Sequence, residues 1–118
     1  MQVTTATSEA LGKYLDLTTA QMRLTATNMA NVDTPGYKTQ GFDFGQQFSR
    51  ALETSSSSPT SPDVEETDGL VARPDGNNVS MDREGVNLAK AQLQFKLGVS
   101  LLRSQYSQVM SAIHGDSK

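Results

Sequence analysis

The sequence contains no cysteine and no tryptophan, and histidine occurs only once. Without cysteine there is no disulfide framework, no thiolate metal site and no cysteine nucleophile. Aromatic residues are few, with four Phe and three Tyr, and hydrophobic residues make up 36% of the 118 residues. A chain this short buries only a modest fraction of its surface on folding. The composition therefore predicts one domain with a small core.

Long apolar runs and long basic runs are also missing. No stretch approaches the roughly 18 apolar residues of a membrane-spanning helix, and no basic segment followed by an apolar one marks a secretory signal. The net charge is −3. No row of basic residues could neutralise a row of phosphates, so we do not expect nucleic acid as a partner.

Catalysis has little support in the sequence. His114 lies near the chain end, and no Ser or Asp is placed beside it by spacing. The segment Gly41–Gly45 lacks the Gly-Lys-Ser/Thr of a phosphate-binding loop, and the carboxylates do not follow the spacing of a calcium-binding loop. We expect no enzyme activity, no cofactor, no metal and no small-molecule substrate.

Residues 8–31 are expected to form a helix, with Thr7 or Ser8 as its N-cap. Its seam repeats at alternating spacings of four and three residues: Leu11, Leu15, Thr18, Met22, Thr25, Met29 and Val32. The helix should stop before Pro35, which lacks an amide proton. Pro35 followed by Gly36 predicts a type II turn, because glycine takes the positive φ that this turn requires.

Residues 82–114 form the strongest predicted helix, with Asp82 as its N-cap. Its seam alternates between four and three without a break: Leu88, Gln92, Phe95, Val99, Leu102, Tyr106, Val109 and Ile113. Gly85 should loosen the first turn of this helix. Gly98 either weakens its middle or permits close packing.

The middle of the chain holds three different segments. Three Phe between residues 41 and 48 should anchor that stretch onto the helices or onto another subunit. Residues 53–69 contain five acidic residues, no basic one and many Ser, so we expect a flexible or loosely draped link. Residues 70–81 are expected to form a small hairpin, with Pro74 and Asp75 at the centre of a type I turn.

The predicted fold is mainly α, with long terminal helices that form a coiled-coil-like layer, a short extended or hairpin segment and a flexible middle. Its first part combines residues 8–34 with 82–114, and its second part covers 35–81. Each helix has more apolar surface than one partner helix can cover. Two interpretations remain: a helical hairpin that dimerises into a four-helix bundle, or a subunit that is completed by its neighbours.

Two segments carry a family resemblance. The stretch from Asn28 to Lys38 resembles the N-terminal signature of the bacterial flagellar rod and hook proteins, in which an Asn pair and Thr-Pro-Gly-Tyr close the first helix. The stretch from Arg73 to Glu84 narrows the resemblance to the proximal rod proteins of that family. The signature residues are Asn28, Asn31, Asp33, Thr34, Pro35, Gly36 and Tyr37.

The resemblance implies a non-enzymatic subunit of the basal body rod, exported by the flagellar type III system and assembled helically in the periplasm around the export channel. It implies as partners copies of the chain itself, other rod proteins, the ring-to-rod adaptor and the export gate. The family's gate motif is a Phe, three residues and an apolar residue. Phe44 with Phe48 fits this motif, and so does Phe48 with Leu52.

The resemblance also assigns a role to the seam of the last helix. Its apolar residues are expected to pack on the first helix and on neighbouring subunits. Two rival interpretations remain. One is a related rod subunit from another position in the axle, and the other is a soluble helical adaptor or export chaperone that acts as a dimer.

Overall fold

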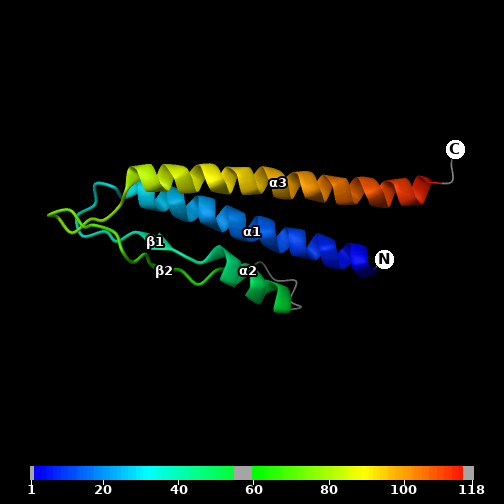
Figure 1. The fold of residues 1–118 in the computed structure, drawn as a ribbon, viewed down its shortest axis with the longest axis horizontal. Coiled ribbons are helices and arrows are strands. Elements are labelled where there is room, and N and C mark those ends of the chain that lie inside the picture. Colours follow the sequence, from blue (N-terminus) through cyan, green and yellow to red (C-terminus); the bar gives the residue numbers. More distant parts are fainter. Residues whose placement is uncertain (1, 55–59, 116–118) are drawn as a thin grey trace.

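The computed structural model describes residues 2–54 and 60–115. The molecule is elongated, with extents of 68 × 27 × 18 Å. Two long helices, α1 (Gln2–Ala30) and α3 (Met81–His114), run antiparallel, and a smaller arm follows α1 on its other side (Figure 1). The described part of the arm covers residues 39–54 and 60–69 and holds β1 (Gln40–Gly41), α2 (Phe44–Glu53) and β2 (Glu65–Glu66). The predicted mainly α fold with long terminal helices is confirmed.

The ends of the long helices differ in detail from the prediction. α1 begins at Gln2, so Thr7 and Ser8 lie inside the helix and the predicted N-cap is wrong. No Pro or Gly precedes these residues to stop the helix from extending toward the N-terminus. The N-cap of α3 is Ser80 rather than Asp82, since the Ser80 side chain accepts a hydrogen bond from the backbone amide of Arg83 at 3.3 Å.

The turn after α1 is confirmed. The backbone amide of Tyr37 donates to the carbonyl of Thr34 at 3.2 Å, and Gly36 has φ +77°. These values fit a type II turn with Pro35 and Gly36 at its centre.

The buried positions of the two long helices are mostly small or polar residues. On α3 they are Glu84, Ala91 and Gly98, and on α1 they include Leu17, Thr18 and Thr25. A Cβ at position 98 would lie 2.7 Å from Leu15 Cδ2, so the backbone of α3 approaches α1 closely at Gly98. Of the two roles predicted for Gly98, the structure has close packing.

The predicted seam of α3 is divided between the two sides of the helix. Leu88, Val99, Leu102 and Val109 are half-buried, whereas Phe95, Tyr106 and Ile113 are exposed. The face turned toward α1 follows the spacing from Glu84 through Ala91 to Gly98 instead. The predicted seam lies beside this face because it was defined by large apolar side chains, whereas the contact face carries small residues that permit close approach.

The arm is anchored on α1, as expected for its aromatic residues. The Tyr14 ring meets Phe44 and Phe48 edge to face, with centroids 5.3 and 5.6 Å apart. Lys13 Nζ donates to the carbonyls of Ala51 and Thr54 at the end of α2. Cations at this end of a helix are favoured by its dipole. These contacts hold α2, which the sequence analysis did not predict, against α1.

The two strands do not lie in the hairpin that the sequence predicted. The turn of residues 73–77 is confirmed, because the amide of Gly76 donates to the carbonyl of Arg73 at 2.8 Å and Gly76 has φ +87°. Its flanking segments form no strand ladder. The antiparallel pair is β1 with β2, in the register Gln40 to Glu66 and Gly41 to Glu65.

Part of the predicted flexible link follows a defined path. The amide of Asp63 donates to Gln47 Oε1 at 3.2 Å, and its carboxylate forms an ion pair with Arg50. The amide of Thr67 donates to the carbonyl of Thr39 at 2.9 Å. Residues 60–69 of the link predicted to be flexible or loosely draped thus follow the arm through polar contacts rather than apolar burial. Residues 55–59 of that link lie outside the described residues.

Candidate functional site

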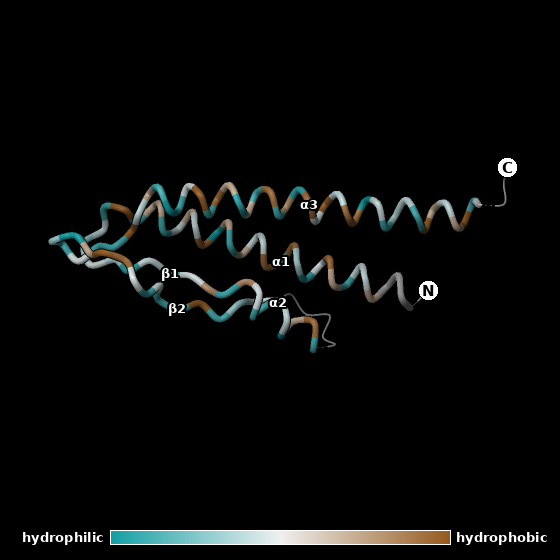
Figure 2. The backbone as a smooth tube through the Cα atoms, in the orientation of Figure 1, coloured by the Kyte–Doolittle hydropathy of each residue, from teal (hydrophilic) through white to brown (hydrophobic). Residues whose placement is uncertain are grey.

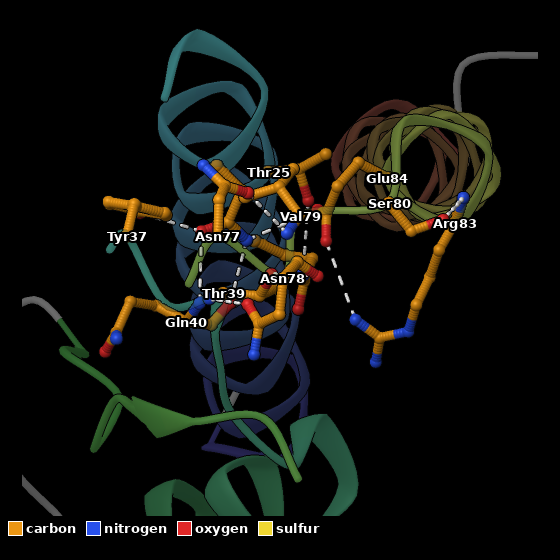
Figure 3. Close-up of polar contacts among 12 residues, drawn as sticks. Thr25, Tyr37, Thr39, Gln40, Asn77, Asn78, Val79, Ser80, Arg83 and Glu84 are labelled. Carbon is orange, nitrogen blue, oxygen red and sulfur yellow. Dashed lines mark hydrogen bonds and ion pairs between the residues drawn. The ribbon is translucent and has the colours of Figure 1, made fainter. Parts of the chain in front are cut away.

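The two signature segments meet at one end of the α1–α3 pair, in a polar cluster that we call the joint (Figure 3). Asn28, near the end of α1, is 2% exposed and forms its centre. Its Oδ1 accepts hydrogen bonds from the Tyr37 hydroxyl at 2.9 Å and the Gln40 amide at 3.1 Å. Its Nδ2 donates to the Gln40 carbonyl at 2.8 Å and to Glu84 Oε2 at 3.3 Å. One side chain thus joins α1, β1 and α3.

Asn77 closes the C-terminal end of α1 from the second segment. Its Nδ2 donates to the carbonyls of Asn31 and Thr34, at 2.9 and 2.8 Å. Its Oδ1 accepts from the amide of Val79 at 2.8 Å. The last carbonyls of a helix have no partner within the helix. Asn77 supplies a partner at the point where the chain leaves α1.

Backbone contacts hold the two turns of the joint together. The amide of Gly36 donates to the carbonyl of Asp75 at 2.9 Å, and Lys38 Nζ donates to the carbonyl of Gly76. A Cβ at position 76 would lie 3.4 Å from the Gly36 Cα. Asn78 Oδ1 accepts from the amide of Thr39 at 2.7 Å. The joint therefore fixes the path of the arm as it leaves α1.

Arg73 ties the loop before α3 to the end of α1. Its guanidinium donates to the carbonyl of Val79 at 3.2 Å and to the carbonyl of Val32. Because the guanidinium is planar and carries several donors, it can bridge two carbonyls from different segments. Arg73 thereby connects the first and the second signature segments directly.

Glu84 is the charged residue of the joint and is 1% exposed. Besides its bond to Asn28, its Oε1 lies 3.5 Å from Arg83 Nη1. Burial of the Tyr37 ring, and secondarily the negative charge of Glu84, raise the pKa of Tyr37. Within the predicted helix of residues 82–114, Glu84 falls in the first turn, and the apolar seam gave no indication of its burial. Glu84 lies seven residues before Ala91 and fourteen before Gly98, and this spacing could have indicated that the three residues share one face of the helix.

The raised pKa of Tyr37 gives the joint a predicted dependence on alkaline pH. A phenol with a raised pKa in the folded state stabilises the fold fully below its unfolded pKa of about 10, and this contribution is lost as the pH rises above that value. We expect Tyr37 to ionise above the ordinary range of a phenol in an ultraviolet absorbance titration. Glu84→Gln should lower the Tyr37 pKa, while Tyr37→Phe should remove this step. An unchanged titration in Tyr37→Phe would contradict this assignment.

The structure places most of the predicted signature residues in the joint. Asn28, Asn31, Thr34 and Tyr37 take part through side chains or carbonyls, and Gly36 through its amide. Asp33 and Pro35 are exposed at the tip. Phe44 and Phe48 lie apart from the joint, in the aromatic contact with Tyr14. Thr39 and Gln40 were not singled out from the sequence, although they directly follow the signature.

A groove of ≈ 480 Å³ separates the arm from α3. Glu65, Glu66 and Asp68 line it from the arm, and Arg83 and Lys90 line it from α3. Among the described residues, no group of three His, Cys, Asp or Glu is arranged to hold a metal ion. In the same part of the chain, no helix has both the length and the hydropathy needed to span a membrane.

α3 leaves many large apolar side chains uncovered, and apolar positions recur along its whole length in Figure 2. The exposed ones are Met81, Val86, Leu93, Phe95, Leu97, Leu101, Tyr106, Met110 and Ile113. An exposed apolar surface of this extent is typical of a protein that binds other chains.

Comparison with known proteins yields one consistent result. The chain is 31% identical to the flagellar basal body rod protein FlgB of Salmonella typhimurium over 121 residues, covering 86% of this chain and 88% of that protein. It is 28% identical to FlgB of Yersinia enterocolitica, covering 84% and 87%, and 30% identical to FlgB of Cereibacter sphaeroides, covering 79% and 82%. No protein-family model matches the chain. These similarities cover most of the chain, which belongs to the FlgB family of flagellar basal body rod proteins.

Proposed function

We infer that the chain is a structural subunit of the bacterial flagellar basal body rod. The observation that carries this conclusion is the joint, since the two segments that resemble rod proteins are about 45 residues apart and meet there through Asn28, Asn77 and Glu84. The joint fixes the angle between the helical pair and the arm. A fixed angle is what a subunit needs in order to repeat in a regular assembly.

The helical pair supplies the assembly surface. Residues Leu88, Phe95, Val99, Leu102, Tyr106, Val109 and Ile113 form the proposed assembly seam. Its half-buried members pack toward α1, while Phe95, Tyr106 and Ile113 remain available to neighbours. The proposed neighbours are copies of this chain, other rod proteins and the ring-to-rod adaptor. The role is mechanical, so we propose no enzyme activity.

The relatives are rod proteins, and they give no support to the alternative of a dimeric adaptor or chaperone. The deciding experiment is complementation of a strain that lacks the gene, followed by purification of basal bodies. The chain should restore motility and be found in the rod. A chain that stays in the cytoplasm as a dimer while motility recovers would contradict the rod assignment.

Phe44 and Phe48 form the proposed export-gate motif. In the folded chain both rings contact Tyr14, and the centroids of Phe44 and Phe48 are 6.2 Å apart. These contacts also stabilise the arm. A test of the motif must therefore separate export from folding.

Phe42 offers a matched control for this test. It stacks on Phe44 with centroids 6.5 Å apart, but the residue four positions after it is the polar Gln46. We expect Phe44→Ala to remain inside the cell and Phe42→Ala to be exported, as measured by immunoblotting of periplasmic and cytoplasmic fractions. Equal export of the two variants would show that Phe44 is not part of a gate motif.

A further inference from the structure

One side of α3, next to the face that packs on α1, carries a row of residues that we call the outer face: Lys96, Val99, Arg103, Tyr106 and Met110. Their spacing of three and four residues places them on one side of the helix. Tyr106 is 60% and Met110 53% exposed, and only Val99 is half-buried. The outer face therefore presents exposed apolar side chains, interleaved with basic ones, to a partner.

The outer face is also positively charged. Residues 85–114 contain Lys90, Lys96 and Arg103 and no acidic residue. Lys96 and Arg103 are seven residues apart and share the outer face, whereas Lys90 points into the groove beside the arm. A partner for this face needs apolar side chains flanked by negative charge.

The arm provides such a surface on its outer strand. Its acidic edge consists of Val64, Glu65, Glu66 and Asp68, all of which are exposed. The ion pairs of the described residues are Arg50 with Asp63 and Arg83 with Glu84, and neither involves this edge. None of the described elements of the arm contacts α3, because the arm follows α1 and the groove lies between (Figure 1). Within one chain, the acidic edge and the outer face do not meet.

We propose that the acidic edge of one copy of the chain docks on the outer face of α3 of a second copy. Carboxylates would pair with Lys96 and Arg103, while Val64 would cover part of the apolar row. Charge complementarity favours a second copy as the partner, since the arm is the most acidic part of the chain and the outer face is basic. This inference rests on the proposed function as a rod subunit.

The symmetry of this contact suits an axial assembly. The acidic edge and the outer face are different surfaces of the same chain, so each copy offers one free surface of each kind after pairing. A heterologous contact of this kind continues along a helix or closes into a ring, rather than stopping at a dimer. Copies of the subunit would thus follow each other in the rod through this one contact.

Charge reversal tests the proposal in a strain that lacks the gene. Two double variants reverse the charge of one surface each: Lys96→Glu with Arg103→Glu, and Glu65→Lys with Glu66→Lys. Each should reduce the number of assembled rods about tenfold or more, since the coupling energies of close charge pairs correspond to changes in affinity of this order. Carrying all four substitutions in one chain should restore assembly. Lys90→Glu, with the same charge change on another side of α3, should have little effect. Retained assembly in either double variant would overturn the proposal. So would failure of the four-fold variant to recover, because the partner would then be a different protein.

Cross-linking provides a readout that does not depend on charge or on recovery of motility. Because the chain has no cysteine, Glu66→Cys and Arg103→Cys can be expressed as separate chains in one cell. They should form a disulfide-linked dimer in assembled rods at about tenfold higher yield than Glu66→Cys with Lys90→Cys. Equal yields would overturn the proposal. If the unaltered chain fails to restore motility, the proposed function fails instead, so the two failures are distinguishable.

Discussion

Asn28→Ala should lower the free energy of unfolding by about 3 kcal/mol, since several buried polar groups then lose their partner. Asn28 accepts from Tyr37 and Gln40, and it donates to the Gln40 carbonyl and to Glu84. Leaving a buried donor or acceptor unsatisfied costs about 1–3 kcal/mol, and more for a charged group. The buried carboxylate of Glu84 makes the loss larger than for an ordinary amide. The effect is measured by urea denaturation followed by circular dichroism.

Asn87→Ala is the matched control for this substitution. Asn87 is half-buried in α3 and lines the groove, but no hydrogen bond ties its side chain to the joint. Replacing it by Ala raises the helix propensity by a few tenths of a kcal/mol. We expect its stability to be unchanged or slightly higher. Equal losses in the two variants would mean that the joint does not stabilise the fold through Asn28.

The loss of Asn28 should also affect assembly. The joint connects α1, β1 and α3, so disrupting it frees the arm to change its angle to the helical pair. If the arm and α3 serve different neighbours, a variable angle prevents both contacts from forming at once. A variant that is folded at low temperature should therefore still assemble poorly. This separates the geometric role of the joint from its contribution to stability.

The sequence was sufficient for the long helices, because their apolar periodicity extends over many turns and they end at clear signals. Pro35 with Gly36, and Pro74 with Asp75, predicted two turns that the structure confirms. The joint could be predicted only in part. Both signature segments were recognised, but their meeting depends on the antiparallel pairing that places Asn28 beside Glu84. No local pattern reports a pairing over that distance.

The short elements of the arm escaped prediction for different reasons. Glu65 and Glu66 have little preference for strands, and they form β2 because the chain pairs with Gln40 and Gly41 there. α2 is amphipathic and begins at Asp43, whose side chain accepts from the amide of Gln46. Asp is a favoured N-cap residue, but Gly45 in the first turn lowers the helix propensity of this segment. Tertiary contacts decided both elements, because α2 packs on α1 and β2 pairs with β1.

Gly98→Ala and Gly85→Ala should change stability in opposite directions, although both replace Gly by Ala in the same helix. At position 85 nothing lies within 4 Å of the added Cβ, so Gly85→Ala should stabilise the fold by about 0.5–1 kcal/mol through reduced chain entropy. At position 98 the Cβ would lie 2.7 Å from Leu15 Cδ2 and 3.1 Å from Tyr14 Cδ1. Either these side chains must shift or the two helices must move apart.

The cost at position 98 depends on whether these neighbours can move. Leu15 Cδ2 is the end of a flexible side chain, but the Tyr14 ring is held by Phe44 and Phe48. Overpacking of this kind costs about 1–3 kcal/mol, which outweighs the gain in helix propensity of about 1 kcal/mol. We therefore expect a net loss of about 1 kcal/mol in urea denaturation. Adding Leu15→Ala should remove most of the overlap, so the effect of Gly98→Ala should be smaller in that background. Equal effects in both backgrounds would contradict the overlap with Leu15 as the cause.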